Sequence, residues 1–151
     1  MPELKDKLRA DLVSSMKARD AVRTRTLRMA LTAITNEEVA GAAARELSDA
    51  EIVQVLIREA KKRRDAAEAF ETGARPQQAA AERAEAEVIA GYLPAQLNDA
   101  ELSDLVAAAI SETGAAGPRG IGQVMKLMTP RIAGRADGAR VAAEVRRQLD
   151  T

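Results

Sequence analysis

The sequence predicts an all-α protein, with four helices in an N-terminal region and a small module of three helices after it. Ala, Leu, Glu, Arg and Lys are abundant, and these residues have high helix propensities. Phe70 and Tyr92 are the only aromatic residues, so the core must consist of small aliphatic side chains, which suit closely packed helices. Apolar residues recur at helical spacing, and no strand-like alternation competes with this pattern.

The first two helices are predicted on either side of Asp20, a residue typical of a helix cap. Leu4, Leu8 and Leu12 follow one another at one-turn spacing, which predicts a helix over residues 3–18. The following segment is apolar over a wide arc, so its helix should lie centrally in the fold. The apolar residues of this arc are Val22, Leu27, Met29, Leu31, Ala33 and Ile34.

A long third helix is predicted to begin at Ser48, whose hydroxyl can cap the amide of Glu51 while the Glu51 carboxylate reaches back. Gly73 ends this helix, because glycine favours the backbone conformation of a C-terminal cap. Pro76 then suits the first turn of a fourth helix. The two helices are expected over residues 49–71 and 76–90.

A boundary between two regions is predicted at Pro94, because proline forces the preceding residue into an extended conformation. The chain then divides into an N-terminal helical region of residues 1–94 and a module of residues 95–151. Asn98 and Glu101 form a second capping signal, which opens the first helix of this module.

The other two helices of the module are bounded by glycine-rich turns. After a loop at residues 114–120, the second helix is expected to stop at Pro130, because proline breaks a helix interior. Asp137 then caps the last helix. The apolar stripes of these helices are Ile121, Val124, Met125 and Met128, followed by Val141, Val145 and Leu149.

Composition excludes several classes of function. The chain has no Cys and no His, which removes disulfides, thiolate nucleophiles, the usual zinc ligands and imidazole acid–base chemistry. We therefore expect no metal and no cofactor. The polar N-terminus lacks the apolar core of a signal peptide, and no apolar run approaches the roughly 20 residues of a membrane span. These features predict a soluble, cytoplasmic protein without a membrane partner.

A polar seam is predicted where the third and fourth helices pair. Glu59 and Arg63 fall inside the apolar stripe of the third helix, and Glu85 falls inside that of the fourth. In a hairpin with its turn near residue 74, Arg63 and Glu85 lie equally far from the turn and face each other. A charge on an apolar seam is tolerated only when it is paired, so we expect a structural ion-pair cluster of Glu59, Arg63 and Glu85. A catalytic carboxylate pair is the less favoured interpretation. The stripe of the fourth helix is taken as Ala81, Ala84, Val88 and Tyr92.

The zero net charge conceals a segregation along the chain. Residues 1–30 hold eight basic and four acidic residues, and residues 119–147 hold seven basic and two acidic ones. Arginine can bridge phosphate oxygens with two parallel hydrogen bonds, so this basic tail is a candidate RNA surface, although a solvated helix face explains each single residue equally well. Aromatic residues that would stack unpaired bases are missing there, so recognition would be of backbone and shape. The RNA-binding candidates are Arg119, Lys126, Arg131, Arg135, Arg140, Arg146 and Arg147.

Short motifs recur in a fixed order along nearly the whole chain. They are residues 16–20 (MKARD), 27–28 (LR), 61–65 (KKRRD) with Glu68 and Phe70, and 92–97 (YLPAQL). They are followed by residues 122–125 (GQVM), Met128 and residues 134–138 (GRADG). The series resembles the YqeY family, and its C-terminal part is similar to the GatB/YqeY domain.

The resemblance implies a helical N-terminal region and a three-helix C-terminal domain of the GatB/YqeY type. That domain also forms the tail of the B subunit of the tRNA-dependent amidotransferase and is appended to some glutaminyl-tRNA synthetases, where it is understood to help bind tRNA. The resemblance therefore implies a non-catalytic accessory protein that binds tRNA and is linked to amidotransferase or aminoacylation systems.

Two alternatives stay open. One is an adaptor that docks on an amidotransferase, a synthetase or the translation machinery. The other is carbon–nitrogen ligase activity with glutamine as amido donor, which would need other subunits. The available serine nucleophiles have no His and no evident Lys base beside them, and one of them is explained as a helix cap. These serines are Ser14, Ser15, Ser48 and Ser103.

Overall fold

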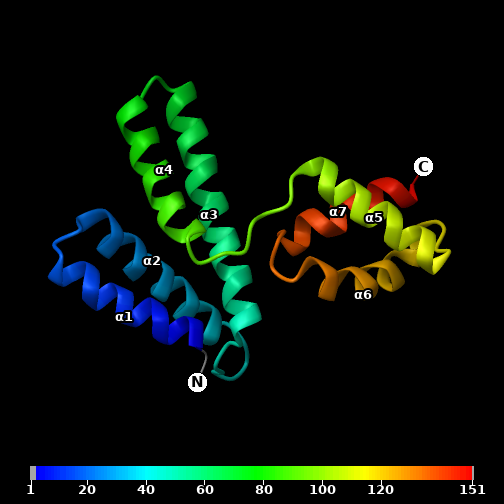
Figure 1. Ribbon diagram of the computed structural model, residues 1–151, viewed down its shortest axis with the longest axis horizontal. Coiled ribbons are helices and arrows are strands. Elements are labelled where there is room, and N and C mark those ends of the chain that lie inside the picture. The colour runs from blue at the N-terminus through cyan, green and yellow to red at the C-terminus, as the bar shows by residue number, and fades with distance from the viewer. Residues whose placement is uncertain (1–2, 151) are drawn as a thin grey trace. The chain divides into compact units, whose positions relative to one another are not determined.

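The computed structural model describes residues 3–150, so the outermost residues of both predicted regions, 1–2 and 151, lie outside the described residues. All regular secondary structure in this range is helical, which confirms the all-α prediction (Figure 1). The chain separates into two compact units, divided between Leu93 and Pro94. None of the helices in residues 3–150 combines the length and apolar character that a membrane crossing requires.

The first unit consists of two helical hairpins. Helix α1 (Glu3–Lys17) pairs with α2 (Ala21–Glu38), and α3 (Asp49–Thr72) pairs with α4 (Pro76–Ala90), as Figure 1 shows. Helix α2 also contacts both α3 and α4, so it is central in this unit, as its apolar arc indicates. The core is formed by Leu8, Leu27, Ala30, Ile34, Leu47, Ile52, Val55, Leu56, Ala60 and Ile89.

The second unit is a bundle of three α-helices preceded by a short connecting segment. It contains α5 (Asp99–Thr113), a short 3-10 helix η1 (Pro118–Gly120), α6 (Ile121–Ile132) and α7 (Gly138–Leu149). Each α-helix packs against the other two. The core is formed by Leu97, Leu102, Val106, Ala109, Val124, Met128, Ile132, Ala136, Val141, Val145 and Leu149.

The predicted N-terminal caps form at the ends of the helices. Asp20, Ser48 and Asn98 each accept a hydrogen bond from the backbone three residues on, and Asp137 accepts one from the Ala139 amide. Asn98 and Glu101 complete a reciprocal capping box. These interactions join residues that are close in sequence, so the helix starts follow from local sequence alone.

The prediction that α6 stops at Pro130 is wrong, because the helix continues to Ile132 with the proline inside it. Ile132 is buried in the core of the second unit. Burying this side chain stabilises the last turn and offsets part of the cost of the backbone hydrogen bond that proline removes. Ala133 then ends the helix in a left-handed conformation.

The apolar stripe assigned to α4 is correct only in part, because Val88 and Tyr92 pack against the core of the first unit but the two alanines do not. Ala81 and Ala84 are exposed, whereas Ala79, Ala86 and Ile89 are buried. Alanine occurs on every side of this helix and therefore carries little information about which side is buried. The long side chain of Ile89 sets the phase through its burial in the core.

Candidate functional site

The structure brings the predicted seam residues Glu59, Arg63 and Glu85 together between α3 and α4. The Arg63 guanidinium lies 3.6 Å from a Glu59 carboxylate oxygen and 3.7 Å from one of Glu85. It also lies 3.8 Å from an oxygen of Glu82, which the sequence interpretation missed. The correct phase of α4 would have indicated Glu82, because this residue lies one turn before the buried Ala86. We call these four residues the Arg63 cluster.

The Arg63 cluster is balanced in charge by two further cations. Arg25 of α2 donates a 2.8 Å hydrogen bond to Glu85, and Lys62 donates a 3.1 Å bond to Glu59. Three cations therefore face three carboxylates. The arrangement holds α2, α3 and α4 in register, and its ion pairs join only carboxylates, guanidinium groups and one lysine. No three acidic side chains in residues 3–150 converge in a way that could hold a metal ion.

A second polar cluster fastens the end of α4 to the first hairpin. The Tyr92 hydroxyl donates a hydrogen bond to Asp11 and accepts one of 2.8 Å from Arg23. Lys7 lies 5.4 Å above the centre of the Tyr92 ring, within cation–π range. Burial raises the pKa of Tyr92 to about 12, with a further contribution from the hydrogen bond to Asp11. In the sequence Tyr92 stands out only as part of an apolar stripe and of the motif at residues 92–97, because its partners Asp11 and Arg23 are 81 and 69 positions away.

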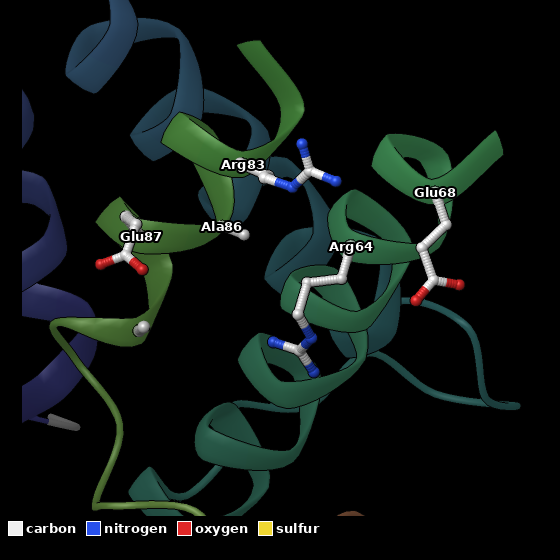
Figure 2. A pocket seen from close by; sticks show the side chains of 6 residues that line it. Arg64, Glu68, Arg83, Ala86 and Glu87 are labelled. Carbon is white, nitrogen blue, oxygen red and sulfur yellow. The ribbon is translucent and has the colours of Figure 1, made fainter. Parts of the chain in front are cut away.

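Beside the α3–α4 hairpin lies a small groove of about 300 Å³. Figure 2 shows Arg83 extending from α4 toward α3, with Arg64 and Glu68 projecting from α3. Glu87 and two alanines complete the lining. Two arginines and two glutamates give this groove no net charge, so its composition favours neither an anion nor a cation.

Three of the predicted RNA-binding residues are engaged in ion pairs inside the second unit. Arg131 pairs with Glu112, whose pKa is held below its usual range by this hydrogen bond. Arg140 donates to Asp99 at 2.7 Å and to the Leu97 carbonyl at 2.8 Å.

Arg147 is the third of these residues and binds Glu144 with two hydrogen bonds, of 2.5 and 2.9 Å. The contact with Arg147, followed by that with Gln148, lowers the pKa of Glu144 to about 2. A guanidinium held in this way is less available to an external phosphate.

Arg135 has a structural contact of another kind, because its guanidinium donates to the backbone carbonyls of Arg131 and Ile132. It thereby binds carbonyls at the C-terminus of α6, where a positive charge is also favoured by the helix dipole. Arg119, Lys126 and Arg146 are exposed, and none of them has an acidic partner among residues 3–150.

The seven candidates are distributed over η1, α6, the turn after α6, and α7. Arg119 and Lys126 lie on the continuous η1–α6 segment, seven residues and therefore about two turns apart, on its solvent side. Arg146 lies on the solvent side of α7. Because each helix of the bundle packs against the other two, the solvent sides of α6 and α7 face in different directions. Arg119 and Lys126 are therefore the pair that a single ligand can reach most directly.

Comparison with known proteins places this chain in a family. No curated protein matches it. The family described as Yqey-like protein matches residues 5–149, which span both compact units and nearly the whole chain. The protein therefore belongs to the YqeY family.

Proposed function

We propose that this protein is a non-catalytic accessory that binds RNA, with tRNA as its target, in the cytoplasm and in association with amidotransferase or aminoacylation systems. The observation that carries the proposal is the exposed pair Arg119 and Lys126, which lies on one side of the η1–α6 segment without an acidic partner among residues 3–150. Two unpaired cations spaced along a helix can contact successive phosphates of one backbone.

The engagement of the other cations narrows the proposed surface. Arg131, Arg140 and Arg147 already neutralise carboxylates within the unit, and Arg135 caps α6. An RNA phosphate would have to compete with these intramolecular partners. The proposed contact therefore rests on Arg119 and Lys126, with Arg146 as a secondary contact.

The proposal is tested by titrating the full chain with an unmodified tRNA transcript at two salt concentrations. We expect the double variant Arg119→Gln/Lys126→Gln to bind at least about tenfold more weakly, because charge-assisted hydrogen bonds are lost. The slope of log affinity against log salt concentration should decrease by about two, one for each phosphate contact that is lost.

The matched control is Arg131→Gln/Arg147→Gln, which removes the same charge from the same unit but at ion-paired positions. This variant should lose much less affinity. Equal losses in the two variants would show only a general effect of net charge, and undetectable binding of the wild-type chain at low salt would refute RNA binding altogether.

A protein-interaction adaptor is the second candidate, and the distribution of cations over the sides of both α6 and α7 favours it. A purified tRNA-dependent amidotransferase, treated with ribonuclease, is the partner to test in a pull-down with the full chain. Retention that survives ribonuclease and the Arg119→Gln/Lys126→Gln change would support the adaptor. Carbon–nitrogen ligase chemistry, if the assembled complex performs it, would reside in the partner's subunits.

A further inference from the structure

An open groove of about 580 Å³ lies at the turn between α1 and α2, and neither the seam nor the C-terminal module accounts for it. Half of its lining residues are arginines and none is acidic. The α3–α4 groove differs in charge, because two arginines and two glutamates line it. The lining residues are Met16, Arg19, Ala21, Thr24, Arg25 and Arg28.

The positive charge of this groove is only partly compensated. Between residues 16 and 28 the chain holds five basic residues and one acidic residue, Asp20. The Asp20 carboxylate caps α2 by accepting the Arg23 amide at 3.1 Å. Arg25 shares its charge with Glu85 through its Nε atom.

Two guanidinium groups of the groove remain available to a ligand. Arg19 and Arg28 have no carboxylate partner among the described residues. A nitrogen of Arg28 lies 3.2 Å from the Met16 sulfur, a contact that orients the guanidinium without neutralising it. The groove therefore presents two uncompensated planar cations and one partly compensated one, which favours an anionic ligand.

Arg19 occupies a backbone position that usually belongs to glycine. Its amide bonds to the Met16 carbonyl and the Asp20 amide to that of Ser15, which is the hydrogen-bond pattern of a Schellman C-cap. The φ angle of Arg19 is +56°, in the left-handed region that favours glycine. Ala74, at the end of α3, has the same pattern and a φ of +57°. A non-glycine residue such as Arg19 is therefore unfavourable for stability at this position. Ala74 has the same backbone conformation as Arg19 but an uncharged side chain.

We propose that the α1–α2 groove binds phosphate groups of an RNA backbone and is a second RNA contact, separate from Arg119 and Lys126. This inference rests on the proposed function and extends it to the first unit. Guanidinium groups match phosphate oxygens in geometry and bind them with paired hydrogen bonds, which suits phosphates presented in succession. The groove has the volume of a typical ligand site, and Met16 and Ala21 supply apolar contacts for the sugar.

The test uses the full chain, an unmodified tRNA transcript and the variants Arg19→Gly and Ala74→Gly. Both substitutions relieve a left-handed residue, but only Arg19→Gly removes a groove cation. We expect Arg19→Gly to weaken RNA binding about tenfold and to lower the salt slope by about one contact, while its melting temperature stays the same or rises. Ala74→Gly should have the same thermal effect and leave RNA affinity unchanged. Arg28→Gln, at an exposed position of α2, should weaken binding in the same way.

The outcomes separate the two proposed contacts. Loss of binding in Arg119→Gln/Lys126→Gln with none in Arg19→Gly and Arg28→Gln would overturn the groove and leave the C-terminal contact intact. The reverse pattern would support the groove and refute the C-terminal contact. If the wild-type chain bound no tRNA, both proposed RNA contacts would be refuted. If polyglutamate bound as tightly as the tRNA transcript and this binding were lost in Arg19→Gly, the groove would be assigned to an acidic peptide and the RNA assignment would be overturned.

Discussion

The Tyr92 hydroxyl donates a 2.5 Å hydrogen bond to the carboxylate of Asp11, and so joins two residues 81 positions apart. Arg23 donates to the same hydroxyl, which fixes its orientation. The contact ties the residue that follows α4 to the first helix of the chain. Tyr92 precedes Leu93, the last residue of the first unit, so this hydrogen bond anchors the unit where the chain leaves it.

Stability at alkaline pH is expected to depend on Tyr92. Burial and the Asp11 contact raise its pKa from 10.0 to about 12, so the folded protein holds the phenolic proton more tightly than the unfolded chain does. The stabilising contribution is then complete below pH 10 and is lost as the pH rises toward 12. Urea unfolding of the wild-type chain and Tyr92→Phe, measured across this range, checks the prediction.

Because Tyr92 is the only tyrosine in the chain, the difference in unfolding free energy between the wild-type chain and Tyr92→Phe reports on this phenol alone. At neutral pH the variant should be less stable by about 1.5–3 kcal/mol, since a hydrogen bond to a charged group is lost. The difference from wild type should shrink above pH 10. A difference that stays constant to pH 12 would contradict the raised pKa.

Removal of Arg63 is expected to destabilise the first unit strongly. The Arg63→Met variant leaves Glu59, Glu82 and Glu85 close together without the cation between them. Breaking a largely buried ion pair by deleting one partner costs about 3 kcal/mol or more. Chemical denaturation gives this value directly.

Arg83→Met is the matched control for Arg63→Met. Arg83 pairs with Glu71 on the surface of the same hairpin, and both side chains are half exposed. An exposed pair contributes less than about 1 kcal/mol. Similar losses in the two variants would show that the Arg63 cluster does not hold the register of the hairpin.

Two glycines of the second unit are expected to respond in opposite ways to alanine. A Cβ atom at Gly120 would lie 2.6 Å from the Cβ of Ala115, so the 3-10 helix could not approach the preceding loop as closely. Overpacking of this kind costs about 1–3 kcal/mol. Gly122 lies in the first turn of α6 with nothing within 4 Å of the added atom.

We therefore expect Gly120→Ala to lower the melting temperature and Gly122→Ala to raise stability by roughly 0.5–1 kcal/mol, through helix propensity. Thermal unfolding followed by circular dichroism measures both. A stabilising Gly120→Ala would show that the loop at Ala115 moves aside freely.

The C-terminal surface shows where prediction from sequence reaches its limit. The basic tail is evident from composition, but its division into engaged and available cations is not. Arg131 meets Glu112 across 19 positions and Arg140 meets Asp99 across 41, and only the packing of the bundle determines these pairs. The α1–α2 groove differs, because Arg25 and Arg28 lie three residues apart on α2 and Arg19 precedes them at the turn. The local excess of basic residues is evident from the sequence, whereas the groove itself is not.

The sequence by itself determined the helices and their starting residues, because helix propensity and caps such as Asn98 act over three or four positions. It also determined that Arg63 faces Glu85, since both are equally far from the α3–α4 turn. In the structure the two side chains lie 3.7 Å apart. The tertiary structure decided which side of α4 is buried and that α6 continues past Pro130. In both cases the burial of one aliphatic side chain contributes: Ile89 selects a side of α4, where alanine has little preference, and Ile132 offsets part of the roughly 3 kcal/mol that proline costs inside α6.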